Sequence, residues 1–129
     1  RGATSVCFIE KVSERTDQIK KNIERFNLQK KSEVLNKDVF ASLLRMGRQK
    51  RSFDIVFLDP PYADNLCTDT VKQIAEHGVV RPGGFVAAEC PKKIDLPEEV
   101  GSLKQIMLRR YGQTKVVIYQ ASSLPCVSG

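Results

Sequence analysis

The chain has 129 residues, of which 41% are hydrophobic and 28% are charged, and this composition is typical of one globular domain with one core. No run approaches the roughly 20 apolar residues of a membrane span, and the first residues lack the apolar stretch of a signal peptide. We therefore expect a cytoplasmic protein, or one from a reducing organelle compartment of bacterial origin, with no membrane partner.

The net charge of +6 is unevenly distributed along the chain. Residues 1–51 hold 13 Lys and Arg against 6 Asp and Glu, whereas residues 52–129 hold 8 against 9. A basic half suits a polyanionic partner, because Lys and Arg that neutralise phosphates release bound counterions. Solvated helix faces on a basic protein are the alternative interpretation of the same charges.

The cysteines and the histidine give no metal-binding pattern. The four cysteines are scattered, and no pair has the C-x-x-C spacing of many zinc and redox sites. Cys7 and Cys90 lie in apolar runs, so we expect them to be buried free thiols in a reducing compartment. His77, the only histidine, has no neighbouring ligand in the sequence, and we therefore expect no metal.

The first half of the chain alternates between strand and helix patterns. Residues 5–10 are a nearly continuous apolar run, typical of a strand buried on both faces of a parallel sheet. Ile19, Ile23 and Phe26 then recur at helical spacing, with charged residues between them. The expected elements are a strand at 5–10, a helix at about 13–27, a weaker strand at 33–36 and a helix that starts at Val39.

The second half contains the strongest strand signal, the run Phe-Asp-Ile-Val-Phe-Leu at residues 53–58. Residues 81–84, Arg-Pro-Gly-Gly, indicate a turn, because proline fixes one dihedral angle and glycine permits positive ones. The other expected elements are a helix at 66–76, a strand at 85–89, strands at 103–108 and 115–119 that pair antiparallel through 110–112, and a flexible tail at 121–129. This order predicts a doubly wound α/β domain over residues 1–120, with a mainly parallel sheet and a C-terminal antiparallel hairpin.

Three acids follow three of the expected strands. Glu10 ends the first strand, Asp38 lies just past the second, and Asp59 directly follows the third. Ligands of open α/β sheets bind outside the carboxyl ends of the strands, where a carboxylate can accept hydrogen bonds from both hydroxyls of a ribose. Glu10 suits that role, unless it is a solvent-facing acid. Asp38 either contacts an adenine amino group or caps the helix that begins at Val39.

The tetrapeptide Asp59-Pro60-Pro61-Tyr62 is the most specific motif. Its two prolines remove two backbone donors and stiffen the chain directly after a buried strand. If the Asp59 carboxylate and the Pro60 carbonyl each accept one N–H of an exocyclic amine, the lone pair of that amine can turn towards an incoming methyl group. Tyr62 offers a ring on which an unstacked base can lie. The alternative is an Asp-Pro turn with Tyr62 packed on the core, but the two earlier strand-end acids favour the catalytic interpretation.

Several stretches together resemble the RsmD-like family of bacterial methyltransferases, which modify the guanine 2-amino group in small-subunit ribosomal RNA. The resemblance runs from Arg1 to about Tyr119, and residues 1–3 with 8–11, residues 53–62 and residues 111–115 carry it. DNA adenine methyltransferases and other amino-methylating enzymes share the tetrapeptide, so it indicates the chemistry. The flanking stretches indicate ribosomal RNA.

The resemblance implies a Rossmann-like class I methyltransferase sheet, the cofactor S-adenosyl-L-methionine, and ribosomal RNA or the assembling small ribosomal subunit as the partner. It also implies the site residues: Glu10 and Lys11 at the cofactor ribose, Asp38 and Val39 at its adenine, and the tetrapeptide at the target amine. The family carries an upstream strand and a glycine-rich loop around the methionine part of the cofactor, and the eight glycines of this chain include no such loop. We therefore expect a domain truncated at its amino end, which is inactive as this fragment.

Two alternatives to this function stay open. A DNA adenine amino-methyltransferase would share the tetrapeptide and act on another polyanion. A non-catalytic, basic RNA-binding fragment would use the charge of residues 1–51 and would not bind the cofactor.

Overall fold

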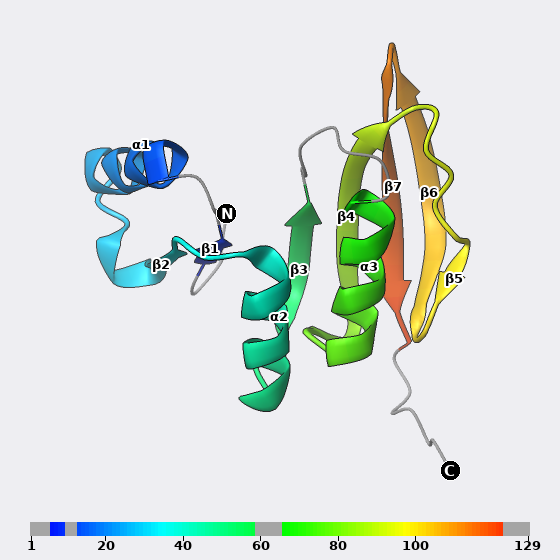
Figure 1. Ribbon diagram of the computed structural model, residues 1–129, viewed down its shortest axis with the longest axis horizontal. Helices are drawn as coiled ribbons and strands as arrows, with labels where there is room; N and C mark the ends of the chain where they lie inside the picture. Colours follow the sequence, from blue (N-terminus) through cyan, green and yellow to red (C-terminus); the bar gives the residue numbers. More distant parts are fainter. Residues whose placement is uncertain (1–5, 10–12, 59–65, 123–129) are drawn as a thin grey trace. The chain divides into compact units, whose positions relative to one another are not determined.

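The computed structural model describes residues 6–9, 13–58 and 66–122 (Figure 1). The chain divides into two compact units, Arg1–Ser42 and Leu43–Gly129, which we call the first and the second unit. The elements are β1 Val6–Ile9, α1 Ser13–Arg25, the short 3-10 helix η1 Gln29–Lys31, β2 Ser32–Leu35, α2 Val39–Arg48, β3 Phe53–Leu58, α3 Leu66–His77, β4 Val80–Pro91, β5 Glu99–Val100, β6 Leu103–Tyr111 and β7 Thr114–Ala121.

The first unit is built on a parallel pair of strands. β1 and β2 pair in register up to Ile9, which lies opposite Leu35, and α1 packs on β2. The apolar stripe of α1 buries Ile23, as the helical spacing predicts. Phe26 was expected on the same stripe, but it lies beyond the helix end and is 64% exposed, with the Arg25 guanidinium 5.7 Å from its ring centre. The apolar stripe therefore stops one turn earlier than the sequence predicted.

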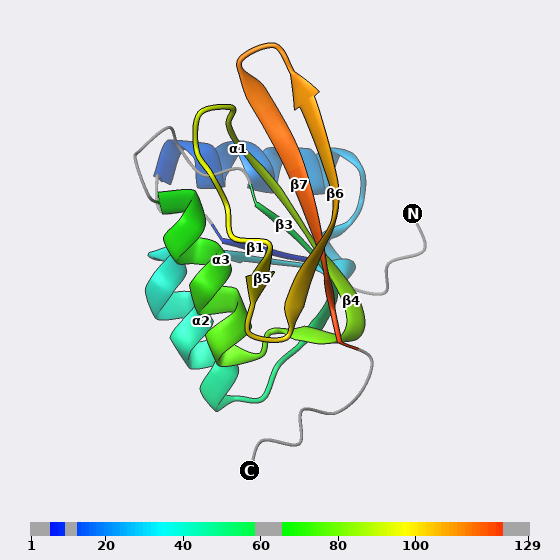
Figure 2. The same ribbon diagram turned by 90° about the vertical axis from the view of Figure 1, so that its right-hand side faces the viewer.

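The second unit contains a five-stranded sheet in the order β3-β4-β7-β6-β5. β3 and β4 are parallel, whereas the β4–β7, β7–β6 and β6–β5 pairs are antiparallel. The α/β class and the C-terminal hairpin are confirmed, but the expectation of a mainly parallel sheet is wrong for this sheet, which is mixed. The last strand enters between β4 and β6, as Figure 2 shows.

The Arg-Pro-Gly-Gly segment at residues 81–84 is a bulge inside β4 rather than a turn before a strand. Phe53 lies opposite Val80 and Ile55 lies opposite Phe85, so residues 81–84 face Asp54 alone. Glycine is required in the bulge, because a Cβ added at Gly84 would come within 2.7 Å of the Asp54 carbonyl oxygen. Residues 81–84 interrupt the regular pairing with β3, so the turn pattern in the sequence does mark a local irregularity, but β4 continues through it.

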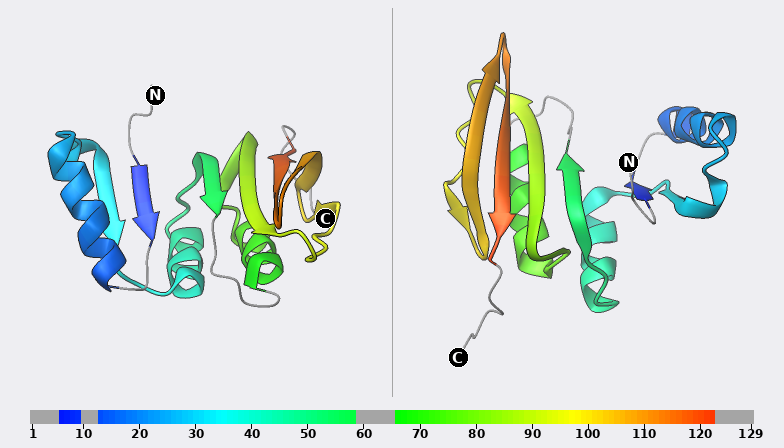
Figure 3. Two further views of the ribbon diagram at one scale, coloured as in Figure 1. Left: turned by 90° about the horizontal axis from the view of Figure 1, so that it is seen from above. Right: turned by 180° about the vertical axis from the view of Figure 1, so that it is seen from behind.

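The core of the second unit lies between α3 and one face of the sheet (Figure 3). Side chains alternate between the two faces of a strand, and in β7 every second residue is buried. Tyr119 is fully buried, and its hydroxyl donates a 2.6 Å hydrogen bond to the Pro97 carbonyl oxygen. On the opposite face Ile55 is 68% and Phe57 is 65% exposed, so the described part of this unit covers only one side of its sheet.

The described helices include none that is both long and apolar enough to cross a membrane.

Candidate functional site

The carboxyl ends of β3 and β4 lie side by side at the edge where the sequence places the amine-binding tetrapeptide. Leu58, the last residue of β3, is 9% exposed and lies opposite Ala88 of β4. Asp59, Pro60, Pro61 and Tyr62 follow it and lie outside the described residues, as do Glu10 and Lys11 after β1. Among the predicted site residues, the structure describes Asp38 and Val39.

Asp38 caps the amino end of α2. Its Oδ2 atom accepts a hydrogen bond from the Ala41 backbone N–H at 3.1 Å, which is the N-cap geometry for a helix that begins at Val39. The Asp38 carbonyl oxygen also accepts hydrogen bonds from Ser42, at 3.0 Å from the backbone N–H and at 2.9 Å from the hydroxyl. The capping interpretation of Asp38 is therefore confirmed, and the proposed contact of its exposed carboxylate with adenine stays a prediction.

Asn36, which the sequence analysis did not single out, connects the loop after β2 to the first turn of α1. Its Oδ1 atom accepts a hydrogen bond from the Thr16 hydroxyl at 3.3 Å, and its Nδ2 atom donates one to the Ser13 hydroxyl at 3.1 Å. We call these three residues the Asn36 clamp. Thr16 is only 2% exposed, although threonine usually lies at the surface. The sequence alone gives little sign of these hydrogen bonds, because Asn36 is separated by 20 residues from Thr16 and by 23 from Ser13.

Two thiols are buried together near the carboxyl end of β4. Cys67 of α3 and Cys90 of β4 are 3% and 2% exposed and share a hydrogen bond. Burial, followed by the nearby Cys90, raises the pKa of the Cys67 thiol to about 12, and burial also raises the pKa of Cys90. Both thiols are therefore neutral near pH 7 and pack as small apolar groups rather than acting as nucleophiles.

The expectation for the cysteines holds for one of the two that it named. Cys90 is a buried thiol, whereas the Cys7 thiol is only half-buried. Cys67, which the apolar-run criterion did not select, is the second buried thiol.

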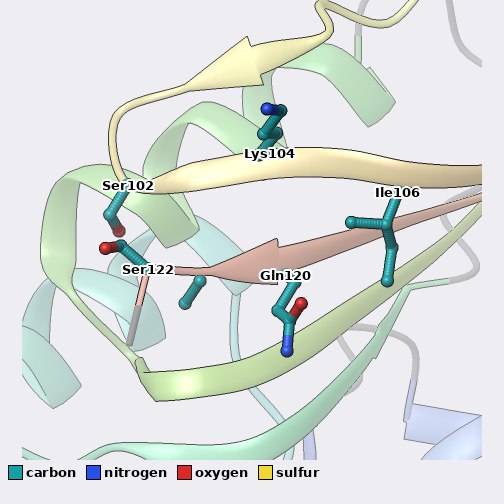
Figure 4. A pocket seen from close by; sticks show the side chains of 6 residues that line it. Ser102, Lys104, Ile106, Gln120 and Ser122 are labelled. Atoms are coloured by element: carbon teal, nitrogen blue, oxygen red, sulfur yellow. The ribbon is translucent and has the colours of Figure 1, made fainter. Parts of the chain in front are cut away.

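A shallow hollow of about 340 Å³ lies over β6 and β7 (Figure 4). Gln120 at the hollow lies opposite Phe85, three residues before Ala88, which is the β4 residue opposite the end of β3. The hollow contains none of the predicted site residues, and it is lined by Ser102, Lys104, Ile106, Gln120, Ala121 and Ser122.

Across the ranges 6–9, 13–58 and 66–122, no three His, Cys, Asp or Glu side chains gather in a way that could hold a metal ion.

The described elements have the fold of α/β methyltransferases. A candidate methylase from Haemophilus influenzae is similar to this chain with a TM-score of 0.81 and 25% identity, over 92% of this chain and 73% of that one. The chain belongs to the conserved hypothetical protein 95 family, the RsmD-like family, since the model of that family matches residues 1–120. That range contains every residue that the sequence analysis assigned to the site, and the predicted family is confirmed.

Two curated relatives carry names that refer to ribosomal RNA. The chain is 29% identical over 120 residues to YlbH of Bacillus subtilis, a candidate rRNA methyltransferase, and the match covers 93% of this chain. It is 30% identical over 108 residues to ribosomal RNA small subunit methyltransferase D of Haemophilus influenzae, with 81% of this chain covered. The chain spans 65% of the first relative and 55% of the second, which is less than two thirds of either.

Proposed function

We propose that the whole protein methylates the 2-amino group of a guanine in small-subunit ribosomal RNA, with S-adenosyl-L-methionine as the methyl donor. The observation that carries the proposal is β3, whose buried last residue leads directly into Asp59-Pro60-Pro61-Tyr62. Membership of the RsmD-like family and the names of the two relatives support ribosomal RNA as the substrate class.

The first unit offers a suitable place for the nucleoside part of the cofactor. β1 and β2 are parallel and stay in register to Ile9 and Leu35, so the chain leaves both strands at the same edge. At such an edge a carboxylate can accept hydrogen bonds from the hydroxyls of a ribose. In the proposal the segments after the two strands supply the contacts: Glu10 and Lys11 at the ribose, and Asp38 and Val39 at the adenine.

The tetrapeptide is the proposed binding site of the target amine. The Asp59 carboxylate and the Pro60 carbonyl accept one N–H each, Pro61 keeps the backbone stiff, and Tyr62 stacks on the base. When bound, S-adenosyl-L-methionine supplies a methyl group on a positively charged sulfur, so the reaction requires neither a metal nor a strong base. The amine nitrogen forms the new N–C bond as the S–C bond breaks, and the cationic amine then loses a proton to water.

Exposed cations of the first unit support a polyanionic substrate. Six of them lie on α1 and on η1 just beyond it, with their side chains exposed, where cations can neutralise phosphates and release counterions: Arg15, Lys20, Lys21, Arg25, Lys30 and Lys31.

The proposal is tested by replacing Asp59 in the whole protein. We expect Asp59→Ala to lower the rate of methyl transfer to small-subunit ribosomal RNA by about 100-fold or more, because the amine loses its charged acceptor. The dissociation constant for S-adenosyl-L-methionine should stay within about twofold, since the carboxylate contacts the amine and not the cofactor. The measurements are transfer of a labelled methyl group, nucleoside analysis of the product, and calorimetry of cofactor binding.

Asp54→Ala is the matched control on the same strand. Asp54 is exposed and forms a 3.0 Å ion pair with Arg81, and surface ion pairs contribute only about 0–1 kcal/mol to stability, so its removal should leave turnover unchanged. Normal turnover by Asp59→Ala would refute the role of the tetrapeptide.

Naked DNA is the discriminating substrate, because other amino-methylating enzymes share the tetrapeptide. Methyladenine in DNA, with no methylguanine in ribosomal RNA, would favour a DNA adenine methyltransferase. A whole protein that binds RNA but not the cofactor would favour the non-catalytic alternative.

A further inference from the structure

We propose that the end of the second unit's sheet at which β4 and β6 finish binds the sugar-phosphate backbone of the substrate RNA beside the methylated base. Five exposed residues form this surface, which we call the basic edge: Lys92, Lys93, Arg109, Arg110 and Tyr111. The inference rests on the proposed function. It assigns to these residues a role in holding the RNA and none in methyl transfer.

The directions of the strands bring the basic edge together. β4 and β6 are each antiparallel to β7, so they run in the same direction and end at the same side of the sheet (Figure 1). Pro91, the last residue of β4, lies opposite Thr114, and Thr114 lies opposite Tyr111, the last residue of β6. The two lysines directly follow the end of β4, and the two arginines directly precede Tyr111.

Hydrogen bonds attach these two strand ends to each other. The Lys92 backbone N–H donates to the Gln113 carbonyl oxygen at 2.8 Å, which joins the segment after β4 to the tip of the β6–β7 hairpin. Within the tip, the Thr114 hydroxyl donates to the Tyr111 carbonyl oxygen at 3.1 Å, and Gly112 provides the positive φ of the turn. The cations therefore stand on a formed surface, and RNA need not order it on binding.

The basic edge concentrates positive charge in a half of the chain that carries little of it. Residues 52–129 contain eight Lys and Arg, and four of these eight belong to the basic edge. The acids closest to it in sequence are Glu89 and Asp95. Within the described residues, no acid forms an ion pair with any of the four cations. Their charges can therefore neutralise phosphates, and each guanidinium can donate two parallel hydrogen bonds to one phosphate.

The basic edge lies on the side of the sheet where β3 also ends. β3 is parallel to β4, and Leu58 lies opposite Ala88, three residues before Pro91. In the strand order β3-β4-β7-β6, β6 is three strand spacings from β3, or about 14 Å. A short stretch of RNA can cross that distance while its target base lies beyond β3. Tyr111, which is 60% exposed, offers a ring on which a neighbouring unpaired base can stack.

The first test removes charge from the basic edge in the whole protein. We expect Arg109→Gln with Arg110→Gln to raise the dissociation constant and the KM for protein-free small-subunit ribosomal RNA about tenfold or more. The slope of log affinity against log salt should become shallower by about 1.5, because two phosphate contacts are lost. The kcat at saturating RNA and the dissociation constant for S-adenosyl-L-methionine should stay unchanged.

Lys72→Gln with Lys104→Gln is the matched control, because it removes the same charge from the same unit. Both lysines are exposed outside the basic edge: Lys72 is on α3, and Lys104 is at the other end of β6, opposite Gln120. A general loss of positive charge would weaken RNA binding equally in the two double variants. A specific surface weakens it only in the arginine variant.

Tyr111 provides a second pair of variants, which tests the stacking contact without a change of charge. Tyr111→Leu removes the ring and should weaken RNA binding about fivefold or more, whereas Tyr111→Phe keeps the ring and should bind RNA as the unmodified protein does. The salt dependence should be the same in both variants. Equal binding by Tyr111→Leu and the unmodified protein would remove Tyr111 from the proposed surface.

The outcomes separate this inference from the proposed function. If the arginine variant and the lysine control share one RNA affinity and one salt slope, while ribosomal RNA is still methylated, the inference is overturned and the proposed function stands. Weaker methylation of assembled subunits, with unchanged affinity for protein-free RNA, would assign the basic edge to a protein of the subunit and also overturn it. A whole protein that methylates no ribosomal RNA would overturn the proposed function and the inference together.

Discussion

At the scale of single residues, Asp38 shows how one side chain can serve the fold and also stand at a candidate ligand site. Its Oδ2 atom caps α2, and the rest of the carboxylate is exposed at the edge where the sheet ends. The sequence allowed both roles, because Asp immediately before a helical pattern is a good cap and Asp after a strand is a common ligand contact.

The two roles of Asp38 can be separated by substitution. We expect Asp38→Ala to lower the free energy of unfolding by about 1 kcal/mol, because α2 loses its cap, whereas Asp38→Ser should retain most of the stability. Urea denaturation measures this difference. If the carboxylate also contacts adenine, both variants should weaken cofactor binding, and a fully stable Asp38→Ala would show that the cap contributes nothing.

The candidate site could be predicted from the sequence only where the signal is local. The tetrapeptide is contiguous in sequence and directly follows a strong strand pattern, and the strand predicted from that pattern, residues 53–58, is β3. Asn36 was missed because its meaning depends on hydrogen bonds to Ser13 and Thr16, and a polar residue in a short loop carries no periodic signal.

At the scale of elements, the three α-helices in the described part of the chain all end in the same way. In each helix a residue with positive φ follows the last turn, and the next residue donates its N–H to a carbonyl five residues earlier, which is the Schellman motif. The residues with positive φ are Asn27 after α1, Lys50 after α2 and Gly78 after α3. The sequence revealed only the last of them, because glycine is the usual residue at this position.

Lys50 is the strained member of this set, and replacing it should stabilise the protein. An L-residue with a side chain costs roughly 1–2 kcal/mol in the left-handed region, so we expect Lys50→Gly to raise the free energy of unfolding by about 1 kcal/mol. Lys50→Ala keeps the strain and should bring no gain. Gly78→Ala should lose about 1 kcal/mol for the same reason, since no atom lies within 4 Å of the added Cβ. Thermal and urea denaturation of the three variants check the signs.

Most elements were predicted within a few residues because the apolar periods of 2 and 3.6 reflect burial directly. The strand order was less accessible, since the entry of β7 between β4 and β6 depends on pairing between distant segments. The segment 81–84 was misread because Pro and Gly produce the same signature in a turn and in a bulge.

At the scale of the whole molecule, the buried thiol of Cys67 and the buried hydroxyl of Tyr119 should make the protein less stable at alkaline pH. Burial raises the pKa of each to about 12, from ordinary values of 9.0 and 10.0. The unfolded chain therefore releases these protons first, so the stability is fully present below about pH 9 and falls as the pH rises towards 12.

This pH dependence can be measured by urea denaturation between pH 8 and about pH 11. We expect the free energy of unfolding to decrease over this range, and the decrease should be smaller in a Cys67→Ala, Tyr119→Phe double variant. An equal slope in the two proteins would show that other groups cause the alkaline loss of stability.

The bulge in β4 determines which side chains of the rest of that strand face the core and which face the opposite side of the sheet. Between the pairs Phe53–Val80 and Ile55–Phe85, β4 advances three residues more than β3. This odd number of extra residues shifts the alternation of side chains between the two faces by one position, and after the bulge Val86, Ala88 and Cys90 are the buried side chains. Loss of one residue from 81–84 would turn the apolar face of β4 to solvent, whereas loss of two would preserve it. Length changes in this segment are therefore tolerated in pairs, and the Arg-Pro-Gly-Gly sequence sets the phase of the strand that borders β3.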